Sequence, residues 1–469
     1  MFPLVEFPEL VHHYAPFFHG VLSDAAFIEF QRYISGLVVS ENKTVDGINR
    51  LCVHESRNQS SLNRLLTQSP FSLETLNQKR LSLLGSLPGT QPKPCGVLSV
   101  DDTLLTHYGE CFEQIAWLYD SNEKRFVWAH NLVTLHYSDD DTDYPVFFRL
   151  WKPVDLDRLE QGLLAAGIPL KDERRALKDS EPKKWRNYLL GVWRRNLKKP
   201  GVLELYDSKL QMAEQFVQQW VDTYPDLKLP VTFDNWYTQP AFCNFLKDLG
   251  LPYVGTLADD DRVALKTGME RLDSFAARLK QEHQAAVEQG QKPVFKPISI
   301  KYKGEREQYY SFRATLHVHN FGKQRVVINH NLPDLSDKPK FLMSNRLIWQ
   351  EAGITRIRRH RWPVEVYHQE GKEEGLDKYQ LRDFEAIERH VASVAVVYSL
   401  LRAAQHDPVL RDKLRRELEI KLEGSVPFWR RATQAQSLWS LALFISASLA
   451  QGHTLHQTMA PLLHAVCHA

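Results

Sequence analysis

In the first 92 residues, most apolar positions follow the spacing of an α-helix. Apolar side chains recur every three or four positions in DAAFIEFQRYISGLV and in SLETLNQKRLSLLGSL, which predicts two amphipathic helices. Ser69 followed by Pro70 is a start signal for the second helix, and Pro88 with Gly89 is a stop signal. The stretch TQPKPCG then breaks the pattern with two prolines and a glycine. We therefore predict a helical N-terminal domain over residues 1–92.

The pattern typical of strands begins next and extends over residues 93–257. The runs GVLSVDDTLL, FVWAHNLVTLHYS and YPVFFRLWK are separated by polar turns and predict three neighbouring strands. Charged sequence with helical periodicity occupies residues 152–228. The short apolar runs LPVTFD and LPYVGTL then flank the helix-like segment AFCNFLKDLG. This alternation of strand, helix and strand predicts a mixed α/β sheet.

A β-rich insertion over residues 258–354 is predicted to interrupt the α/β sequence. Residues 265–290 have the spacing of a helix, and residues 293–344 are rich in strand-type runs such as YYSFRATLHVHNFG. Helical sequence returns at Trp362, so we expect the α/β core to resume over residues 355–410.

Helices are also predicted for the C-terminal region, residues 411–469, and for the segment before it. FEAIERHVASVAVVYSLL places one apolar stripe on a helix, made of Ile387, Val391, Val394, Tyr398 and Leu401. KLRRELEIKLEG has a basic amphipathic pattern. SLWSLALFISASLA is the most apolar run, but it is shorter than the roughly 20 residues that cross a bilayer. We interpret it as a buried helix and expect no membrane association.

Size and composition are those of a folded globular protein. A chain of 469 residues with 43% hydrophobic and 25% charged residues predicts two to four structural units. The 59 basic and 57 acidic residues nearly cancel, so net charge predicts no partner. The N-terminus lacks the pattern of a signal peptide, and the chain contains no phosphate-cradling or dinucleotide motif, so we expect no nucleotide cofactor. The scattered cysteines fit a reduced cytoplasmic interior: Cys52, Cys95, Cys111, Cys243 and Cys467.

Three acidic residues stand where side chains converge beyond the edge of a sheet. Asp102 ends the first predicted strand, Asp234 ends the fourth, and Glu365 lies in the first turn of the helix in RWPVEVYHQEGK. Carboxylates gathered in this way can hold the two Mg²⁺ ions that phosphodiester transfer uses. One aspartate at a strand end is more often a turn or capping residue, so the prediction depends on the set.

The segment around Glu365 is the most specific of the three. Pro363 suits the first turn of a helix, because its missing N–H would be unpaired there. Lys372 lies two turns after Glu365 on the same face, and Arg361 lies four residues before it, at the helix entrance. This arrangement suits a site that handles phosphate, although simple ion pairing on a solvated face would give the same spacing.

The spacing Arg361-x3-Glu365-x6-Lys372 resembles the Tyr-x2-Arg-x3-Glu-x6-Lys signature of DDE transposases of bacterial insertion sequences, the cut-and-paste group. Asp102 in DDT and Asp234 in FDNWY resemble the strand-end aspartates of that family. The order of the three acids and a β-rich insertion before the glutamate agree with it too. The resemblance covers roughly residues 96–403 of the chain.

The sequence departs from the signature at one position and leaves another open. Arg358 stands where the family has tyrosine, which puts a role for that hydroxyl in doubt. Asp101 is directly before Asp102, so the first metal ligand is uncertain by one residue. The residue directly before Thr103, which is Asp102, fits the motif better.

The resemblance implies an RNase H-like catalytic core, a mixed sheet flanked by helices, with helical units at both ends of the chain. It implies that Asp102, Asp234 and Glu365 hold two Mg²⁺ ions, which Mn²⁺ can replace. The enzyme would cut the ends of a mobile element and transfer the 3′-OH ends into target DNA. Double-stranded DNA would be its partner, a homodimer would form the synaptic complex, and the site of action would be the bacterial cytoplasm, at the nucleoid.

Two other functions remain open. One is a DNA-binding protein derived from a transposase that no longer catalyses, and the other is an RNase H-like nuclease that cuts without joining. A soluble α/β protein with incidental acidic residues would require every motif match to be chance.

Several residues are candidates for contacts with DNA. By resemblance, Arg361 and Lys372 hold phosphates near the cut, and Arg358 and Arg359 belong to the same basic cluster as Arg356. Relatives stack a tryptophan of the insertion on an extruded base, for which Trp349 is the candidate, although a core tryptophan is the commoner case. A second basic cluster, interleaved with Trp185, Tyr188 and Trp193, contains Lys183, Lys184, Arg186, Arg194, Arg195, Lys198 and Lys199. Such runs are more often solvated faces. We expect the N-terminal domain to recognise the element ends.

Overall fold

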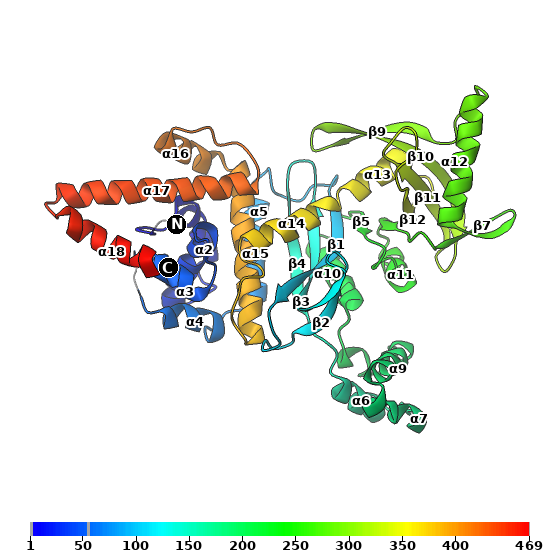
Figure 1. Ribbon diagram of the computed structural model, residues 1–469, viewed down its shortest axis with the longest axis horizontal. Coiled ribbons are helices and arrows are strands. Elements are labelled where there is room, and N and C mark those ends of the chain that lie inside the picture. Colours follow the sequence, from blue (N-terminus) through cyan, green and yellow to red (C-terminus); the bar gives the residue numbers. More distant parts are fainter. Residues whose placement is uncertain (1–2, 54–56, 469) are drawn as a thin grey trace.

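One mixed sheet runs through the middle of the molecule. The structure is a computed structural model and describes residues 3–53 and 57–468. Its twelve strands follow the order β2-β3-β1-β5-β6-β12-β11-β10-β7-β8, with β4 paired to β3 and β9 paired to β10. Helices flank the first half of this sheet, and the predicted α/β class with a mixed sheet is confirmed (Figure 1).

The first half of the sheet combines antiparallel and parallel strands. β1 (Val97–His107), β3 (Arg125–Ser138) and β4 (Asp143–Trp151) are antiparallel neighbours, as predicted. β5 (Val231–Phe233) pairs parallel to β1, and β6 (Tyr253–Thr256) pairs parallel to β5. The sequence analysis missed the short edge strand β2 (Ala116–Asp120), which pairs with the start of β3. Its side chains are half-buried or exposed, so it carries little apolar signal.

Among the described residues, six helices precede the sheet, and the two predicted from apolar spacing are present. They are α1 (Glu9–Tyr14), η1 (Ala15–Phe18), α2 (Asp24–Val39), α3 (Val45–Leu51), α4 (Gln59–Thr67) and α5 (Leu73–Ser86). The predicted start of the last helix at Ser69 and Pro70 is wrong by three residues. Ser72 is the cap, because its hydroxyl accepts a hydrogen bond from the Thr75 N–H at 3.2 Å.

The N-terminal helices share their core with a long helix from the other end of the chain. α15 (Phe384–His406) carries the predicted apolar stripe, but it is buried on nearly every side because α2, α4, α5 and α17 pack around it. Apolar residues from these helices and from the sheet form one continuous core. The N-terminal helices therefore depend on α15 for burial of their apolar faces.

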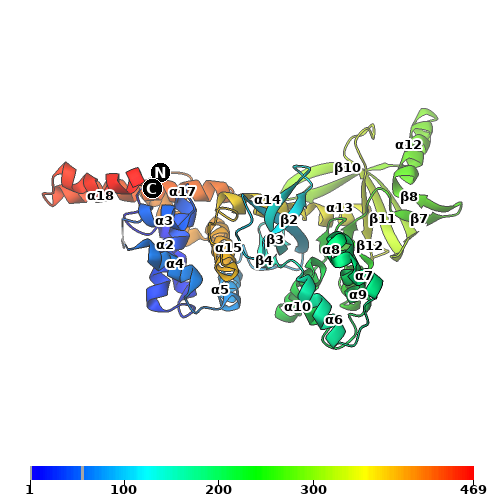
Figure 2. The ribbon, with the colours of Figure 1, turned by 60° about the horizontal axis from the view of Figure 1, so that its bottom comes forward.

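A small helical lobe projects from the sheet between β4 and α10 (Lys209–Thr223). It contains α6 (Leu156–Ala165), α7 (Asp172–Arg175), α8 (Leu177–Ser180), α9 (Pro182–Arg195) and the turn η2 (Leu203–Leu205). Trp185 and Trp193 are buried in its core, which is separate from the main one. Figure 1 shows the lobe standing away from the sheet, and in the turned view of Figure 2 it lies below the insertion strands β11 and β12. α11 (Pro240–Asp248) joins β5 to β6.

The predicted β-rich insertion continues the same sheet. β12 pairs antiparallel with β6, and the remaining insertion strands extend the sheet beyond it. The sequence analysis missed one hairpin, so the predicted helical start at residue 265 is wrong, and the helix begins at Leu272. The insertion contains β7 (Arg262–Leu265), β8 (Gly268–Arg271), α12 (Leu272–Glu288), β9 (Lys296–Tyr302), β10 (Glu305–Val318), β11 (Gly322–His330) and β12 (Lys340–Ser344).

Helices complete the chain after the insertion. Helical structure returns earlier than Trp362, because α13 (Glu351–Arg359) precedes α14 (Trp362–Glu373). α16 (Pro408–Leu418) ends where Glu419 adopts φ +54°, so the rest of the KLRRELEIKLEG run is not helical. α17 (Val426–Ala450) and α18 (Leu455–His468) follow. Within the described residues, no helix is long and apolar enough to cross a membrane.

The interpretation of SLWSLALFISASLA as a buried helix is wrong. This segment is the second half of α17, and it carries exposed apolar side chains, among them Trp439 at 45% and Leu443 at 53% exposure. The first half of α17 packs on α15 and α2, but the helix then runs past them, and α18 turns back from its far end (Figure 1). Apolar composition does not reveal where the covering elements stop.

Candidate active site

Two adjacent aspartates lie in the middle of β1. The prediction that Asp102 ends its strand is wrong, because β1 continues to His107 and pairs with β3 along its whole length, with Asp102 opposite Val133. Successive side chains of a strand point to opposite faces. Asp101 and Asp102 therefore reach different groups, and the one-residue ambiguity of the sequence becomes a structural question.

Asp102 accepts hydrogen bonds from three side chains. Its carboxylate contacts the Lys209 Nζ at 2.8 Å, the Asn131 Nδ2 at 2.7 Å and the Tyr237 hydroxyl at 2.9 Å. Ser208 caps α10 with a capping box, which places Lys209 in the first turn of that helix. The ammonium of Lys209 also lies 4.1 Å above the Trp236 ring. Asp102 thus has a cation and two neutral donors, and its charge is compensated.

Asp101 faces α14 and shares a cation with Glu365. The guanidinium of Arg361 donates hydrogen bonds to both carboxylates. Arg361 is the N-cap residue of α14, Pro363 is in the first turn, and Glu365 is in the first turn as predicted. Ser99, two residues before Asp101 on the same face of β1, also contacts this region, since its hydroxyl lies 3.4 Å from the His360 carbonyl.

Asp234 directly follows β5, as predicted, and lies beside Asp101. In the parallel pairing Val100 is opposite Phe233, so the next residues along the two strands are Asp101 and Asp234. The Asp234 carboxylate accepts backbone N–H groups from Trp236 at 3.0 Å and Tyr237 at 3.2 Å. It therefore also acts as the turn residue that the sequence analysis considered as an alternative.

Burial and mutual repulsion make Asp101 and Asp234 reluctant to be charged together. Burial raises the pKa of Asp101 to about 7, the charge of Arg361 opposes this rise, and the charges of Asp234 and Asp102 add to it. Burial also raises the pKa of Asp234, against the backbone hydrogen bond from Tyr237 and the charge of Arg361. Two neighbouring carboxyls of this kind are stabilised in their ionised form by a cation.

The donor chemistry of these acids fits a divalent metal, but their arrangement is incomplete. Within residues 3–53 and 57–468, no three His, Cys, Asp or Glu side chains gather closely enough to hold a metal ion. Asp101 and Asp234 offer the hard oxygen ligands that Mg²⁺ prefers. Glu365 is joined to Asp101 only through the Arg361 guanidinium, which supplies positive charge between them.

A pocket lined by cations opens beside the acids. It has a volume of about 360 Å³ and lies between the insertion sheet and the α13–α14 segment. Burial, together with the charge of the neighbouring Arg361, lowers the pKa of Arg358 to about 9. Excess positive charge in a pocket favours an anion such as a phosphate. Its lining comprises Tyr309, Asn329, Lys340, Leu342, Thr355, Arg358, Arg359, Arg361 and Trp362.

The predicted DNA-binding residues are distributed unequally around this pocket. Arg361, Arg358 and Arg359 line it; Arg358 donates to the Thr256 hydroxyl at 2.9 Å, and Arg359 pairs with Glu307 at 3.0 Å. Lys372 lies two turns along α14 and is not among the lining residues. Trp349 is half-buried and packs against a small apolar cluster of β6, β11, β12 and α13.

Several side chains at the site, Lys340 of the pocket among them, were not singled out from the sequence. Lys209, Asn131 and Tyr237 come from three separate segments, and no local pattern marks them as neighbours of Asp102. Trp362 is 51% exposed and lines the cationic pocket. Its position directly after Arg361 was the one signal in the sequence that could have identified it.

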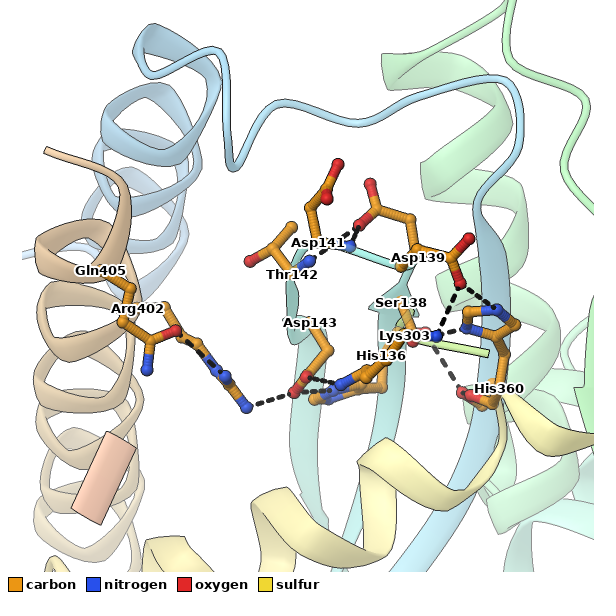
Figure 3. Close-up of polar contacts among 12 residues, drawn as sticks. His136, Ser138, Asp139, Asp141, Thr142, Asp143, Lys303, His360, Arg402 and Gln405 are labelled. Atoms are coloured by element: carbon orange, nitrogen blue, oxygen red, sulfur yellow. Dashed lines mark hydrogen bonds and ion pairs between the residues drawn. The ribbon is translucent and has the colours of Figure 1, made fainter. Parts of the chain in front are cut away.

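A buried polar cluster fixes the insertion and the start of α14 against the core (Figure 3). Asp143 of β4 is buried and meets the Arg402 guanidinium and the Lys303 ammonium, each at 2.8 Å, and His136 at 3.3 Å. Lys303 lies in the turn between β9 and β10, so this contact ties the insertion to the sheet. Burial alone would raise the pKa of Asp143, but the charges of Arg402 and Lys303 hold it well below its usual value.

The same cluster holds the joint between α13 and α14. His360, between the two helices, contacts the Ser138 hydroxyl through Nδ1 at 2.9 Å. Asp140 receives the Lys303 backbone N–H at 3.1 Å and the Arg356 guanidinium at 2.9 Å. The residue after His360 is Arg361, so these contacts determine where the guanidinium meets Asp101 and Glu365.

The sequence profile of the DDE superfamily endonucleases matches residues 16–268, more than half of the 469 residues. This region contains Asp101, Asp102 and Asp234, and Glu365 lies beyond it. No curated protein sequence matches the chain.

Among the solved structures that resemble the chain, one does so at 12% identity and a TM-score of 0.41, over 94% of this chain and 78% of that one. It is a cryo-EM structure of the piggyBac transposase synaptic complex with hairpin DNA. The profile match covers more than half of the chain, and it shows that the chain belongs to the DDE superfamily endonucleases.

Proposed function

We propose that this protein is a transposase, which cleaves DNA at the ends of a mobile element and transfers the 3′-OH ends into target DNA. The observation that carries the proposal is the junction at Arg361. This one guanidinium contacts Asp101 and Glu365 and also lines the cationic pocket, so a carboxylate site and a phosphate-binding site share a border. Phosphodiester chemistry needs both.

Asp234 and Glu365 would each ligate a metal ion, together with one residue of the Asp101–Asp102 pair. The motif favours Asp102. The contacts favour Asp101, because it neighbours Asp234 and is linked to Glu365, whereas Lys209 already neutralises Asp102. Two Mg²⁺ ions, for which Mn²⁺ can substitute, would supply activation of the attacking oxygen and stabilisation of the leaving oxygen.

The side chains around the pocket would bind and orient the DNA strand. Lys340, Arg358 and Arg361 would contact phosphates, because their mutual repulsion is relieved by an anion. Lys372 would contact a phosphate further along α14, in line with its place in the signature. For a stacking contact with an extruded base, exposure favours Trp362 over the half-buried Trp349.

A homodimer in the synaptic complex is supported by the C-terminal hairpin of α17 and α18. No Asp, Glu, Lys or Arg occurs after Arg431. The two helices diverge from their connecting turn, where the Ser448 and Thr458 hydroxyls lie 2.7 Å apart (Figure 1). The divergence leaves apolar side chains exposed, namely Leu438, Trp439, Leu443, Phe444, Leu449, Leu455, Leu463 and Val466.

A second copy is the occupant that suits this uncharged surface. An isologous contact would place the same apolar faces against each other and would bury no formal charge. The exposed side chains are too numerous to be scattered surface residues, because they occupy both helices of one projecting hairpin.

We assign recognition of the element ends to the N-terminal helices, because the catalytic site would contact phosphates and would not read the base sequence. Deletion of residues 1–92 is a poor test, because it would uncover the apolar surface of α15. Substitution of exposed cations such as Arg64→Gln and Lys79→Gln tests the assignment on a folded chain. Loss of sequence-specific retardation in a gel shift is expected, and unchanged retardation would contradict the assignment.

The decisive experiment supplies the purified full-length chain with labelled DNA carrying the inverted repeats that flank its gene. With Mg²⁺ or Mn²⁺ and a target plasmid, we expect cleavage at the repeat ends followed by joined products. Cleavage without joining would identify a nuclease. Intact, bound DNA would identify a DNA-binding protein without catalysis. Genomic sequence with short inverted repeats bracketed by direct duplications would support the transposase independently.

A further inference from the structure

The lobe formed by α6 to α9 carries a concentration of positive charge that the proposed active site does not use. Between Glu181 and Pro200 the chain has seven basic residues and one acidic residue. All seven basic side chains are exposed, whereas Trp185 and Trp193 are buried in the lobe core. The basic residues are Lys183, Lys184, Arg186, Arg194, Arg195, Lys198 and Lys199.

Most of these cations form one face of α9. An interval of eleven residues is close to three helical turns, so Lys183 and Arg194 form one row and Lys184 and Arg195 form the next. Each row is about 16 Å long, which equals about five base steps of a DNA strand at 3.4 Å per step. We call these four residues, with Lys198 and Lys199 in the following turn, the α9 basic face.

Ion pairing does not account for this face. Among the described residues, one member of the face forms an ion pair: Lys184 pairs with Glu181. The cations of the neighbouring helices behave differently: Lys178 pairs with Asp157 and Glu160, and Arg175 pairs with Glu160. The lobe therefore has paired cations on one part of its surface and uncompensated cations on another.

Helix stability does not account for it either. Cations are favourable in the last turn of a helix, which applies to Arg194 and Arg195. Lys183 and Lys184 lie in the first turn, where the helix dipole opposes positive charge, and this turn contains no acidic residue. Two lysines in an unfavourable position indicate that the face has a use apart from holding the helix.

The surroundings of the face favour duplex over single-stranded nucleic acid. Proteins that bind single strands offer aromatic side chains on which bases stack. The aromatic residues of α9 are not available for stacking, because Trp185 and Trp193 are buried and the half-buried Tyr188 hydroxyl accepts the Lys171 N–H at 2.9 Å. A face of cations without stacking groups matches the phosphate backbone of a duplex.

We propose that the α9 basic face binds the phosphate backbone of double-stranded DNA without regard to sequence. The lobe is joined directly to the candidate active site, since η2 ends at Leu205 and Lys209, four residues later, contacts Asp102. DNA held by the lobe would thus lie on a part of the surface continuous with the site. The inference rests on one part of the proposed function, namely that the protein binds duplex DNA.

The test compares two variants of the full-length chain that lose equal charge from the same lobe. The first is Lys183→Gln/Lys184→Gln/Arg194→Gln/Arg195→Gln. The matched control removes four other exposed cations, Arg158→Gln/Lys171→Gln/Arg175→Gln/Lys178→Gln. Thermal melting of both proteins establishes that each is folded. Affinity for a random-sequence duplex is measured without divalent metal at salt concentrations between about 50 and 200 mM.

The first variant is expected to bind the random duplex at least about ten-fold more weakly at low salt, with its salt slope reduced by roughly 2 to 4. The control should keep the affinity and slope of the original protein. Equal losses in both variants, or no loss in the first, would overturn the proposal.

Single-stranded DNA, duplex RNA and anionic lipid vesicles serve as competing probes. A larger loss for any of these than for duplex DNA would also overturn the proposal. Cleavage of repeat-end DNA with Mg²⁺ is assayed separately with the unaltered protein. The unaltered protein could fail to cleave while the two variants still differ in their affinity for duplex DNA. That result would refute the proposed function and leave this inference standing.

Discussion

Arg361 donates a hydrogen bond to Asp101 although the two residues are 260 positions apart in the chain. The contact joins the middle of β1 to the start of α14, and it brings Glu365 into the same group. The cation compensates two carboxylates at the place where the proposed function needs metal ions. Which aspartate of β1 belongs to this group is therefore the first question for experiment.

Asp101→Asn is expected to abolish cleavage, because it removes the carboxylate that faces Asp234 and Glu365. Asp102→Asn should reduce the cleavage rate by about 10- to 100-fold, the usual effect of losing a group that supports a metal ligand. Single-turnover cleavage with titrated Mg²⁺ measures both effects, and a gel shift with the same DNA verifies that binding is retained.

Asp234→Asn and Glu365→Gln are the reference variants for this comparison, since both should behave as Asp101→Asn does. Retained cleavage in Asp101→Asn together with complete loss in Asp102→Asn would assign the first ligand to Asp102, as the sequence motif does. Retained cleavage in Asp234→Asn or Glu365→Gln would refute the three-carboxylate assignment itself.

Asp143→Ala is expected to lower the free energy of unfolding by about 3–5 kcal/mol, because it leaves the buried Arg402 without its partner. Arg125→Ala is the control: Arg125 pairs with Glu123, both side chains are exposed, and losing an exposed pair costs about 0–1 kcal/mol. Urea unfolding of both variants measures the difference. If Asp143→Ala proved as mild as Arg125→Ala, the cluster in Figure 3 would not anchor the insertion.

Local patterns in the sequence predicted the helix that carries Glu365 better than they predicted the strand opposite it. Arg361, Pro363 and Glu365 are on one helical turn, so spacing alone places them relative to each other. The extent of β1 depends on its pairing with β3, a segment about 30 residues away, and the polar run Asp101-Asp102-Thr103 resembled a strand end. The partners of Asp102 depend on tertiary contacts and follow from no local rule.

Burial was the other property that local patterns could not provide. The apolar segment from Ser437 to Ala450 was expected to be covered, since periodicity identifies apolar faces but not the elements that pack on them. The hairpin β7–β8 was missed for a related reason: its strands have four residues each, and apart from Val263 their side chains are exposed or half-buried. Long, strongly patterned elements such as β3 and α15 were predicted because their signal does not depend on neighbours.

Leu443→Asp/Phe444→Asp is expected to make the protein monomeric if α17 and α18 form the contact between two copies. Both side chains are exposed on the projecting part of α17, so the folded monomer tolerates the charges, whereas an apolar interface does not. Light scattering coupled to size-exclusion chromatography, with and without repeat-end DNA, gives the oligomeric state.

Val409→Asp is the control for this experiment, because Val409 is an exposed apolar residue on α16, away from the hairpin. It should leave the oligomeric state unchanged. A double variant that still dimerises on DNA would exclude the hairpin as the interface.

We expect the fold to lose stability in acid, because it contains buried histidines that are neutral. His390 is the example whose hydrogen bonds define the neutral form most clearly. His390 lies between the Tyr33 hydroxyl at 2.6 Å and the Gly375 carbonyl at 2.7 Å, and both are satisfied by a neutral ring with its proton on Nε2. Burial lowers the pKa of His390 from 6.5 to about 4. Between these two values the unfolded chain binds the proton and the folded chain does not. The free energy of unfolding should therefore fall by about 1.4 kcal/mol per pH unit for this group as pH drops from 6.5 toward 4.

His390→Gln should remove this contribution, so its stability at pH 7 is lower than that of the original protein but depends less steeply on pH. Urea unfolding at several pH values between 7 and 5 measures the slope, with His319→Gln, at an exposed position, as the control that should keep the original slope. An unchanged slope in His390→Gln would mean that His390 does not remain neutral in the fold, and the hydrogen bonds to Tyr33 and Gly375 would then need a protonated ring and a reoriented hydroxyl.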